Sequence, residues 1–227
     1  MGPVHMSGDR FAGQRRGLIA LMQDKGIRDL NVLRAFDLVH RHEFLPHAMQ
    51  HRAYEDVPVP IGFGQTASQP SLQAFYMQAL DIGRNDRVLE IGTGCGFQTA
   101  VLAQLADRVY SVERIRDLAV RSRDKLDELR ISNVAILVGD GTIGWSRYAP
   151  YDCILVAAAA PDVPQPLLDQ MADGGRMLIP VGTREMQRLV MVRRNGDQYE
   201  QEEILDCTFV PLLGRFGWAG EAPGNGG

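Results

Sequence analysis

The first part of the chain carries hydrophobic residues at the spacing of one helix face. Leu18, Leu21 and Met22 keep the i, i+3, i+4 spacing, and Gly26 is suited to end that helix. The helices predicted on this basis span residues 11–25, 31–39 and 71–80. The stretch 40–70 between the last two holds several prolines and is predicted to be irregular. A loop of this length inside a compact domain is more often functional than idle.

From residue 87 onward, short apolar runs alternate with helical patterns. The predicted strands span residues 87–91, 109–112, 134–138, 153–156, 176–181, 188–193 and 198–209, and the predicted helices between them span 97–105, 118–129 and 165–171. This alternation is typical of parallel βα units. Asn195-Gly196 between the last two strands is a strong hairpin signal. We therefore expect an α/β fold: a doubly wound, mostly parallel sheet of seven strands that ends in an antiparallel hairpin, with N-terminal helical additions.

The bulk composition narrows the class of protein. The chain has 227 residues, enough for one good-sized domain, and 45% of them are hydrophobic. Its net charge of −4 argues against a nucleic-acid partner bound through bulk charge. No run approaches the roughly 18 apolar residues that cross a membrane. Cys95, Cys153 and Cys207 are scattered, which favours free thiols in the cytoplasm. No apolar interface stripe remains after core assignment, so a monomer is the default expectation.

The segment Val88–Gly96 combines a buried-type strand with a glycine-rich turn that opens a helix. Gly92, Gly94 and Gly96 form the pattern G-x-G-x-G, whereas a dinucleotide-binding turn carries G-x-G-x-x-G. Glu90 precedes the first glycine by two residues and would repel a pyrophosphate. A cationic amino-acid cofactor suits this acid better, and S-adenosylmethionine carries both a sulfonium and an ammonium group. A tight strand–helix turn that binds nothing is the alternative.

Acidic residues also end the next two predicted strands. In an open α/β sheet, ligands bind beyond the carboxyl ends of the strands. Glu113 follows Glu90 by one βαβ unit, where a carboxylate can accept from both ribose hydroxyls, and Asp140 could accept from the adenine amino group. Each acid alone would more often be a solvated surface charge, but three beside a glycine turn favour a cofactor site. The residues predicted to bind the cofactor are Glu90, Gly92, Thr93, Gly94, Gly96, Gln98, Glu113, Arg114, Asp140 and Gly141.

Four histidines cluster in the irregular stretch, at positions His40, His42, His47 and His51. The last two have the i, i+4 spacing of a helical zinc site. However, the segment does not read H-E-x-x-H, and Pro46 would break a helix that spans it. We expect surface or interface histidines and no metal site.

Six short stretches along the chain carry a further signature. They are Pro60–Pro70, Val88–Thr99, Ser111–Arg114, Gly139–Gly141, Gly174-Gly175 with Leu178–Gly182, and Phe209–Leu212. Together they resemble the family of protein-L-isoaspartate O-methyltransferases, over about residues 15–213. The pattern Gly-Gln-Thr-x-Ser-x-Pro is highly specific to it, whereas the glycine turn marks only the broader methyltransferase class. Cys95, Phe97 and Ala157 depart mildly from residues common in the family.

The resemblance implies a Rossmann-like, S-adenosylmethionine-dependent enzyme that acts on isoaspartyl-containing proteins and peptides. It implies Ser68 as the active-site residue, with Thr66 and Gln69 on the same wall. It also implies that Val210 shapes the substrate groove. The alternative role for Ser68 is that of a helix N-cap.

The chemistry that the resemblance implies fits the residues. The acceptor is a free α-carboxylate, which is ionised at neutral pH, so no general base is needed. The sequence shows no recognisable triad of nucleophile, histidine and acid. The methyl ester would close to a succinimide and so begin repair. Two alternatives are methyl transfer to a small molecule or RNA, and a non-catalytic protein that binds the cofactor and a peptide.

We expect one compact domain with four parts. Residues 1–8 are expected to be a flexible N-terminus or the remnant of a segment added for expression, with Met6 as the natural start. Residues 9–80 form a helical segment with the active-site loop, residues 81–213 form the cofactor-binding core, and residues 214–227 form a flexible tail.

Overall fold

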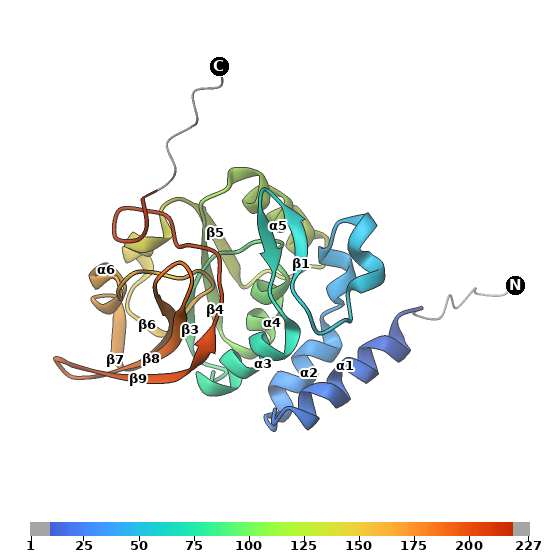
Figure 1. Ribbon diagram of the computed structural model, residues 1–227, viewed down its shortest axis with the longest axis horizontal. Helices are drawn as coiled ribbons and strands as arrows, with labels where there is room; N and C mark the ends of the chain where they lie inside the picture. Colours follow the sequence, from blue (N-terminus) through green and yellow to red (C-terminus); the bar gives the residue numbers. More distant parts are fainter. Residues whose placement is uncertain (1–9, 220–227) are drawn as a thin grey trace, which may run out of the picture.

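The computed structural model describes residues 10–219 (Figure 1). The expected flexible N-terminus lies outside these residues, as does the end of the expected tail. Residues 214–219 of that tail are described: the Gly214 N–H donates to the Trp218 carbonyl, and the Arg215 N–H donates to the Asp140 carboxylate. In the described part of the chain, no helix combines the length and the apolar character needed to span a membrane.

A seven-stranded sheet forms the centre of the fold, in the order β5-β4-β3-β6-β7-β8-β9. Its strands are β3 (Arg87–Ile91), β4 (Arg108–Glu113), β5 (Val134–Val138), β6 (Tyr151–Val156), β7 (Met171–Gly182), β8 (Gln187–Asn195) and β9 (Gln198–Cys207). The pairs from β5 to β7 are parallel, whereas β8 is antiparallel to both of its neighbours. Asn195 pairs with Gln198, and Gly196 between them has a φ of +60°, as a tight hairpin requires. The predicted sheet and its terminal hairpin are confirmed.

The helices lie close to their predicted positions. They are α1 (Ala12–Asp24), α2 (Leu30–Leu38), α3 (Pro70–Ala79), α4 (Phe97–Leu105), α5 (Arg116–Glu128) and α6 (Gln165–Leu168). α6 ends earlier than the predicted 165–171, because Met171 already pairs with Tyr151 as part of the sheet.

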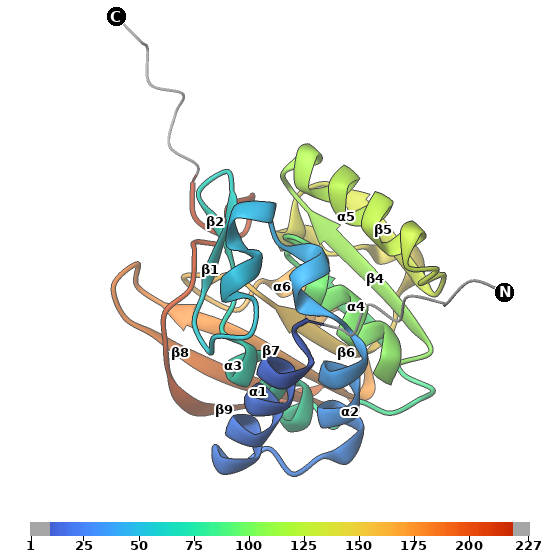
Figure 2. The same ribbon diagram turned by 90° about the vertical axis from the view of Figure 1, so that its right-hand side faces the viewer.

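The stretch between α2 and α3 is more regular than its prolines suggest. It contains two 3-10 helices, η1 (Arg41–Phe44) and η2 (His47–Arg52), and an antiparallel hairpin of β1 (Val59–Gly62) and β2 (Gln65–Ala67). Figure 2 shows these elements side by side, and β1 packs on η2. The prediction of an irregular segment was wrong here. Both strands of a two-stranded sheet are edge strands, where a residue without an N–H such as Pro60 is tolerated.

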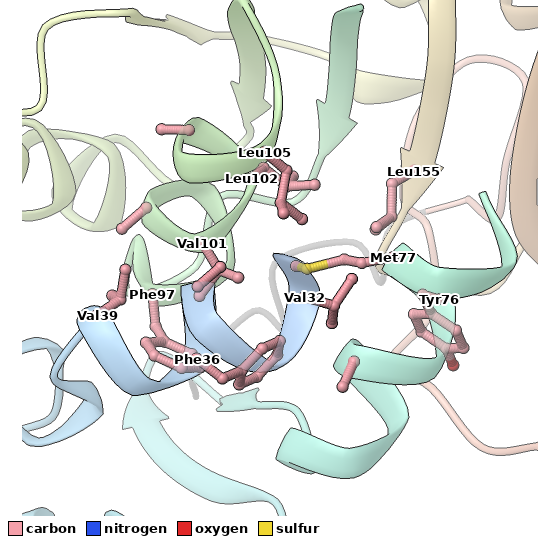
Figure 3. Close-up of a cluster of buried hydrophobic side chains, with 14 of the residues drawn as sticks. Val32, Phe36, Val39, Tyr76, Met77, Phe97, Val101, Leu102, Leu105 and Leu155 are labelled. Atoms are coloured by element: carbon pink, nitrogen blue, oxygen red, sulfur yellow. The ribbon is translucent and has the colours of Figure 1, made fainter. Parts of the chain in front are cut away.

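The two faces of the sheet are covered unequally. One face packs against α1 to α5, and Figure 3 shows Met77 of α3 and Leu102 of α4 on the side of Leu155 of β6, with Phe36 of α2 beside Phe97 of α4. The opposite face packs against a smaller layer that includes Leu167 of α6. Because both faces are covered, β5 (VAILV) and the segment Cys153–Val156 of β6 carry apolar side chains toward both faces. The helical layers leave the carboxyl ends of the strands open for a site.

Candidate active site

A cavity of about 1050 Å³, open mouth included, lies between the β1–β2 hairpin and the carboxyl ends of β3, β4 and β6. Most residues predicted for the site lie on its wall: Thr66, Ser68, Gly92, Thr93, Gly94, Gln98, Glu113, Arg114, Gly141 and Val210. The structure places the remaining predicted residues off the wall: Gln69, Glu90, Gly96 and Asp140.

The glycine turn after β3 uses backbone conformations that other residues rarely adopt. Gly92, Gly94 and Gly96 have φ values of +97°, +55° and +85°. The Ser122 hydroxyl donates to the Gly94 carbonyl (2.8 Å) and holds the turn against α5. A Cβ on Gly96 would lie 3.1 Å from the Ser122 Cβ. Gly96 therefore allows α4 and α5 to pack closely, while the first two glycines present bare backbone to the cavity.

Two acceptor groups face the cavity from different elements. Glu113 at the end of β4 is 7% exposed, and its carboxylate accepts from the Gly94 N–H (2.9 Å) and the Ile115 N–H (2.8 Å). Each of its oxygens keeps a further acceptor position. The buried Gln73 of α3 donates to Gln98 (3.2 Å), and its Oε1 has no partner among the described residues. These acceptors and the bare turn fit a ligand that carries hydroxyl and ammonium donors.

Glu90 lies behind the glycine turn, not in the cavity. Side chains alternate along a strand, so Glu90 and its paired neighbour Ser111 share the face covered by α4. Its buried carboxylate accepts from Gln98 (3.0 Å), Thr99 (2.6 Å) and Ser111 (2.6 Å). Burial raises the pKa of Glu90 to about 7, although these hydrogen bonds oppose the shift. Glu90 therefore supports Gln98, which does line the cavity, and its direct contact with the cofactor stays a prediction.

We expect Glu90 to make the protein less stable as the pH rises from about 4.5 to about 7. In this window the folded state binds more protons than the unfolded state, so stability falls with rising pH. Relative to a Glu90→Gln variant, the wild-type free energy of unfolding should decline by up to about 3 kcal/mol and stay level above the window. Urea unfolding of both proteins at about pH 5, 6, 7 and 8 measures this difference. Parallel pH profiles of the two proteins would contradict it.

Asp140 is also turned away from the cavity. Its carboxylate accepts from the Thr142 N–H (2.8 Å), the Thr142 hydroxyl (2.7 Å) and the Arg215 N–H (2.8 Å). The adjacent Gly141 does line the cavity, and a Cβ there would clash with Ile91. Asp140 therefore shapes the loop after β5, and its contact with an adenine amino group stays a prediction.

Ser68 is half-buried on the cavity wall, and no group among the described residues hydrogen-bonds to its hydroxyl. The N-cap of α3 is Gln69, and Pro70 occupies the first helical position. Asp56, from the loop after η2, accepts from the Ser71 N–H (2.8 Å), which is the task of a helix cap. The alternative role of Ser68 as an N-cap is therefore filled by other residues.

Of the three residues predicted to contact the substrate, two line the cavity and one does not. Thr66 and Val210 line the cavity, whereas the Gln69 amide donates to Asp56 (2.9 Å) and to Ser71 (3.2 Å). Sequence reasoning did not name several other wall residues: Ile61, Gln65, Gln73, Ile115, Ala158 and Leu212. Ile61, Gln65 and Leu212 lie within the Pro60–Pro70 and Phe209–Leu212 stretches that carried the resemblance, whereas Gln73, Ile115 and Ala158 lie outside all of the stretches that carried it.

Of the four histidines near one another in the sequence, His40 and His42 are half-buried and lie together, whereas His47 and His51 are exposed. His40, His42 and Glu43 bring possible ligand atoms within 4.8 Å of one another. The two imidazole rings stack with an interplanar angle of 20°, and the His42 Nδ1 lies 2.8 Å from the Tyr54 hydroxyl. Ring nitrogen lone pairs lie in the ring plane, so two nearly parallel rings do not direct them at one ion. The expectation of no metal site stays a prediction.

The sheet order, the glycine turn and the acid at the end of the neighbouring strand define a Rossmann-like, S-adenosylmethionine-dependent methyltransferase. The family model for protein-L-isoaspartate(D-aspartate) O-methyltransferase (PCMT) matches residues 13–217. The chain therefore belongs to this family.

Individual relatives agree with the family match. The protein-L-isoaspartate O-methyltransferase of Dictyoglomus thermophilum is 45% identical over 208 residues, which cover 92% of this chain and 94% of that protein. Protein-L-isoaspartate O-methyltransferase 2 of Geotalea uraniireducens is 50% identical over 199 residues, covering 87% and 91%. A solved protein-L-isoaspartate O-methyltransferase structure superposes with a TM-score of 0.82 at 29% identity, covering 89% of this chain and 67% of that one.

A second solved structure shares the fold. It comes from Plasmodium falciparum and is described as a PCMT in complex with S-adenosyl-L-homocysteine. The TM-score is 0.77 at 24% identity, with 88% of this chain and 98% of that one covered.

Proposed function

We propose that the protein transfers the methyl group of S-adenosylmethionine to the free α-carboxylate of L-isoaspartyl residues in proteins and peptides. Its family membership supports this activity. The observation that carries the proposal is that the segment Gln65–Ser68 and the turn Gly92–Cys95 line one cavity. A methyl donor held at the turn and an acceptor held at the segment would share one space, as direct transfer requires.

The cofactor would be held by the wall residues of the turn and the neighbouring strands. When bound, S-adenosylmethionine supplies an electrophilic methyl group on a positively charged sulfur. Glu113 would accept from ribose hydroxyls, and the unpaired Oε1 of Gln73 suits an ammonium donor. The full proposed set on the wall is Gln73, Gly92, Thr93, Gly94, Gln98, Glu113, Arg114 and Gly141. Glu90, Gly96 and Asp140 would act indirectly, by holding α4 and the loops around the site.

The proposed reaction needs a positioned acceptor and a dry site, and no general base. The α-carboxylate arrives ionised because its pKa lies far below 7. Charge is dispersed as the anion and the cation react, so water would slow the reaction. Ile61, Phe97 and Val210 give the wall apolar surface that excludes water. The Ser68 hydroxyl would donate to one carboxylate oxygen and orient the other toward the methyl group, with Thr66 beside it.

The product of this reaction explains how the activity would serve repair. Attack of the next backbone nitrogen on the methyl ester closes a succinimide and releases methanol. Hydrolysis of the succinimide then returns part of the material to a normal aspartyl bond. We propose that this takes place in the cytoplasm, by a monomer without nucleic-acid or membrane partners. The free thiols of Cys95, Cys153 and Cys207 and the net charge of −4 support this setting.

A methyl-transfer assay with paired peptides tests the proposed function. Methyl-labelled S-adenosylmethionine is offered with an isoaspartyl peptide and with its normal aspartyl twin. We expect base-labile label on the isoaspartyl peptide alone, because only this peptide presents an α-carboxylate at the damaged position. Label on neither peptide, despite tight cofactor binding, would overturn the proposal in favour of another acceptor or a non-catalytic role.

A further inference from the structure

Arg41 is an arginine held in the interior beside the active-site serine. It begins η1 and is 1% exposed. Burial lowers the pKa of Arg41 to about 10, which leaves the guanidinium protonated at neutral pH. Among the described residues it forms no ion pair with a carboxylate; its partners are carbonyl oxygens. A buried charge is costly unless it is well hydrogen-bonded, so these partners indicate what the side chain holds in place.

The Arg41 guanidinium fixes the backbone of Ser68 on both sides. Its Nη2 donates to the Ser68 carbonyl (3.0 Å) and to the Ala67 carbonyl (3.4 Å). These carbonyls belong to the two peptide planes that flank the Ser68 Cα. Because the planes set φ and ψ of Ser68, holding both fixes the direction of its Cα–Cβ bond. Arg41 thus sets the position of the Ser68 Cβ, which carries the hydroxyl.

The other end of the guanidinium anchors this arrangement to the rest of the fold. Nη1 donates to the Ala53 carbonyl (2.9 Å) at the end of η2. The guanidinium carbon also lies 5.8 Å from the ring centroid of Phe97, the first residue of the helix that follows the glycine turn. Arg41 therefore connects the serine segment to the helix on the cofactor side of the cavity.

Asp56 holds the residues on the other side of Ser68. Its carboxylate accepts from the Gln69 amide (2.9 Å), the Ser71 N–H (2.8 Å), the Ser71 hydroxyl (2.7 Å) and the Lys25 ammonium (2.6 Å). Burial raises the pKa of this carboxyl, and these hydrogen bonds outweigh burial and lower it to about 2. The buried cation of Arg41 thus holds the Ala67 and Ser68 carbonyls, and the anion of Asp56 holds Gln69 and Ser71, which follow Ser68 in the chain.

We propose that Arg41 is a positioning residue for methyl transfer, which acts with Asp56 by fixing the backbone that carries the Ser68 hydroxyl. The inference rests on the proposed function, because it assigns to Arg41 a part in the same reaction. Arg41→Lys keeps the charge, but one nitrogen cannot reach both the Ala53 side and the Ser68 side. We expect turnover on an isoaspartyl peptide to fall by about 10- to 100-fold, since a small displacement of a positioned group has effects of this size. The dissociation constant for S-adenosylmethionine should change by less than about 3-fold.

A double-mutant cycle separates positioning from general destabilisation. Turnover is measured for wild type, Arg41→Lys, Ser68→Ala and the double variant, with cofactor affinity and circular dichroism recorded for each. If Arg41 acts through Ser68, the Arg41→Lys effect should shrink to less than about 2-fold in the Ser68→Ala background. The matched control is Arg123→Lys: the half-buried Arg123 of α5 also donates to backbone carbonyls, those of Val134 (2.9 Å) and Ile131 (3.3 Å). This control should lose stability without losing turnover.

Each outcome of the cycle bears on the inference. Two results would overturn the inference when the wild type methylates the peptide. One is that the fold-losses in turnover of the two single variants multiply in the double variant. The other is that a folded Arg41→Lys protein keeps the wild-type turnover. An inactive wild type would overturn the proposed function and this inference with it. If Arg41→Lys does not fold, Asp56→Asn takes its place in the cycle. The same loss of turnover, absent again in the Ser68→Ala background, is then expected, and a multiplicative loss would reject the positioning role.

Discussion

Replacement of Glu113 by alanine should weaken the binding of S-adenosylmethionine by about 100- to 1000-fold. Glu113 is the last residue of β4, lines the cavity and is 7% exposed. A hydrogen bond to a charged acceptor contributes about 1.5–3 kcal/mol, and two ribose hydroxyls would donate to this carboxylate. The same carboxylate also accepts from the Gly94 N–H, so its loss loosens the turn that faces the cofactor. Both effects act on affinity in the same direction.

Calorimetric titration of S-adenosylmethionine and S-adenosyl-L-homocysteine measures the effect. Glu128→Ala serves as the control, because Glu128 lies at the far end of α5, where it pairs with Lys125 at the surface. Thermal unfolding of both variants shows whether Glu113→Ala remains folded at the temperature of the titration. An affinity within about 3-fold of the wild type in a folded Glu113→Ala protein would remove Glu113 from the proposed cofactor site.

The difference between Glu113 and Glu90 shows where sequence reasoning stops. Both acids come at the ends of predicted strands, and both were expected to contact the cofactor. Glu113 is the terminal residue of its strand, so its carboxylate can reach the N–H groups of the adjacent loops. Glu90 pairs with Ser111, two residues before Glu113, so both acids point to the same face of the sheet. Glu90 lies further from the carboxyl edge of the sheet and is covered by α4. A setback of two register positions on one face therefore decides between a wall residue and a buried support.

The alternating strands and helices of the sheet were predictable because their sequence signals are local. β3 and α4 begin and end where apolar periodicity and the glycine turn predict them. The β1–β2 hairpin was missed because its prolines are typical of irregular segments, and the pairing of Val59 with Ala67 depends on tertiary contacts. Arg41 was missed for a similar reason. Its acceptors on either side of the Ser68 Cα are backbone carbonyls 26 and 27 residues away, and every residue has a carbonyl, so no residue type signals the contact.

Replacement of Ser68 by alanine should lower turnover on an isoaspartyl peptide by one to three orders of magnitude, while cofactor binding survives. Ser68 lies on the cavity wall, and its hydroxyl is free of intramolecular partners among the described residues. The hydroxyl is therefore available to donate to an acceptor carboxylate, and loss of one positioned donor typically costs about 100- to 1000-fold in turnover. The glycine turn and Glu113 do not contact this hydroxyl, so cofactor affinity should stay within about 2-fold.

The two measurements must be made on the same protein, because the prediction concerns their difference. Single-turnover methyl transfer reports the positioned donor, and calorimetric titration reports the cofactor site. Ser132→Ala is the matched control, since Ser132 is exposed in the loop between α5 and β5, and both quantities should remain at wild-type values. Unchanged turnover together with lost cofactor affinity would assign Ser68 to the cofactor site instead. It would also remove the reason for a buried arginine to fix the backbone on both sides of this one serine.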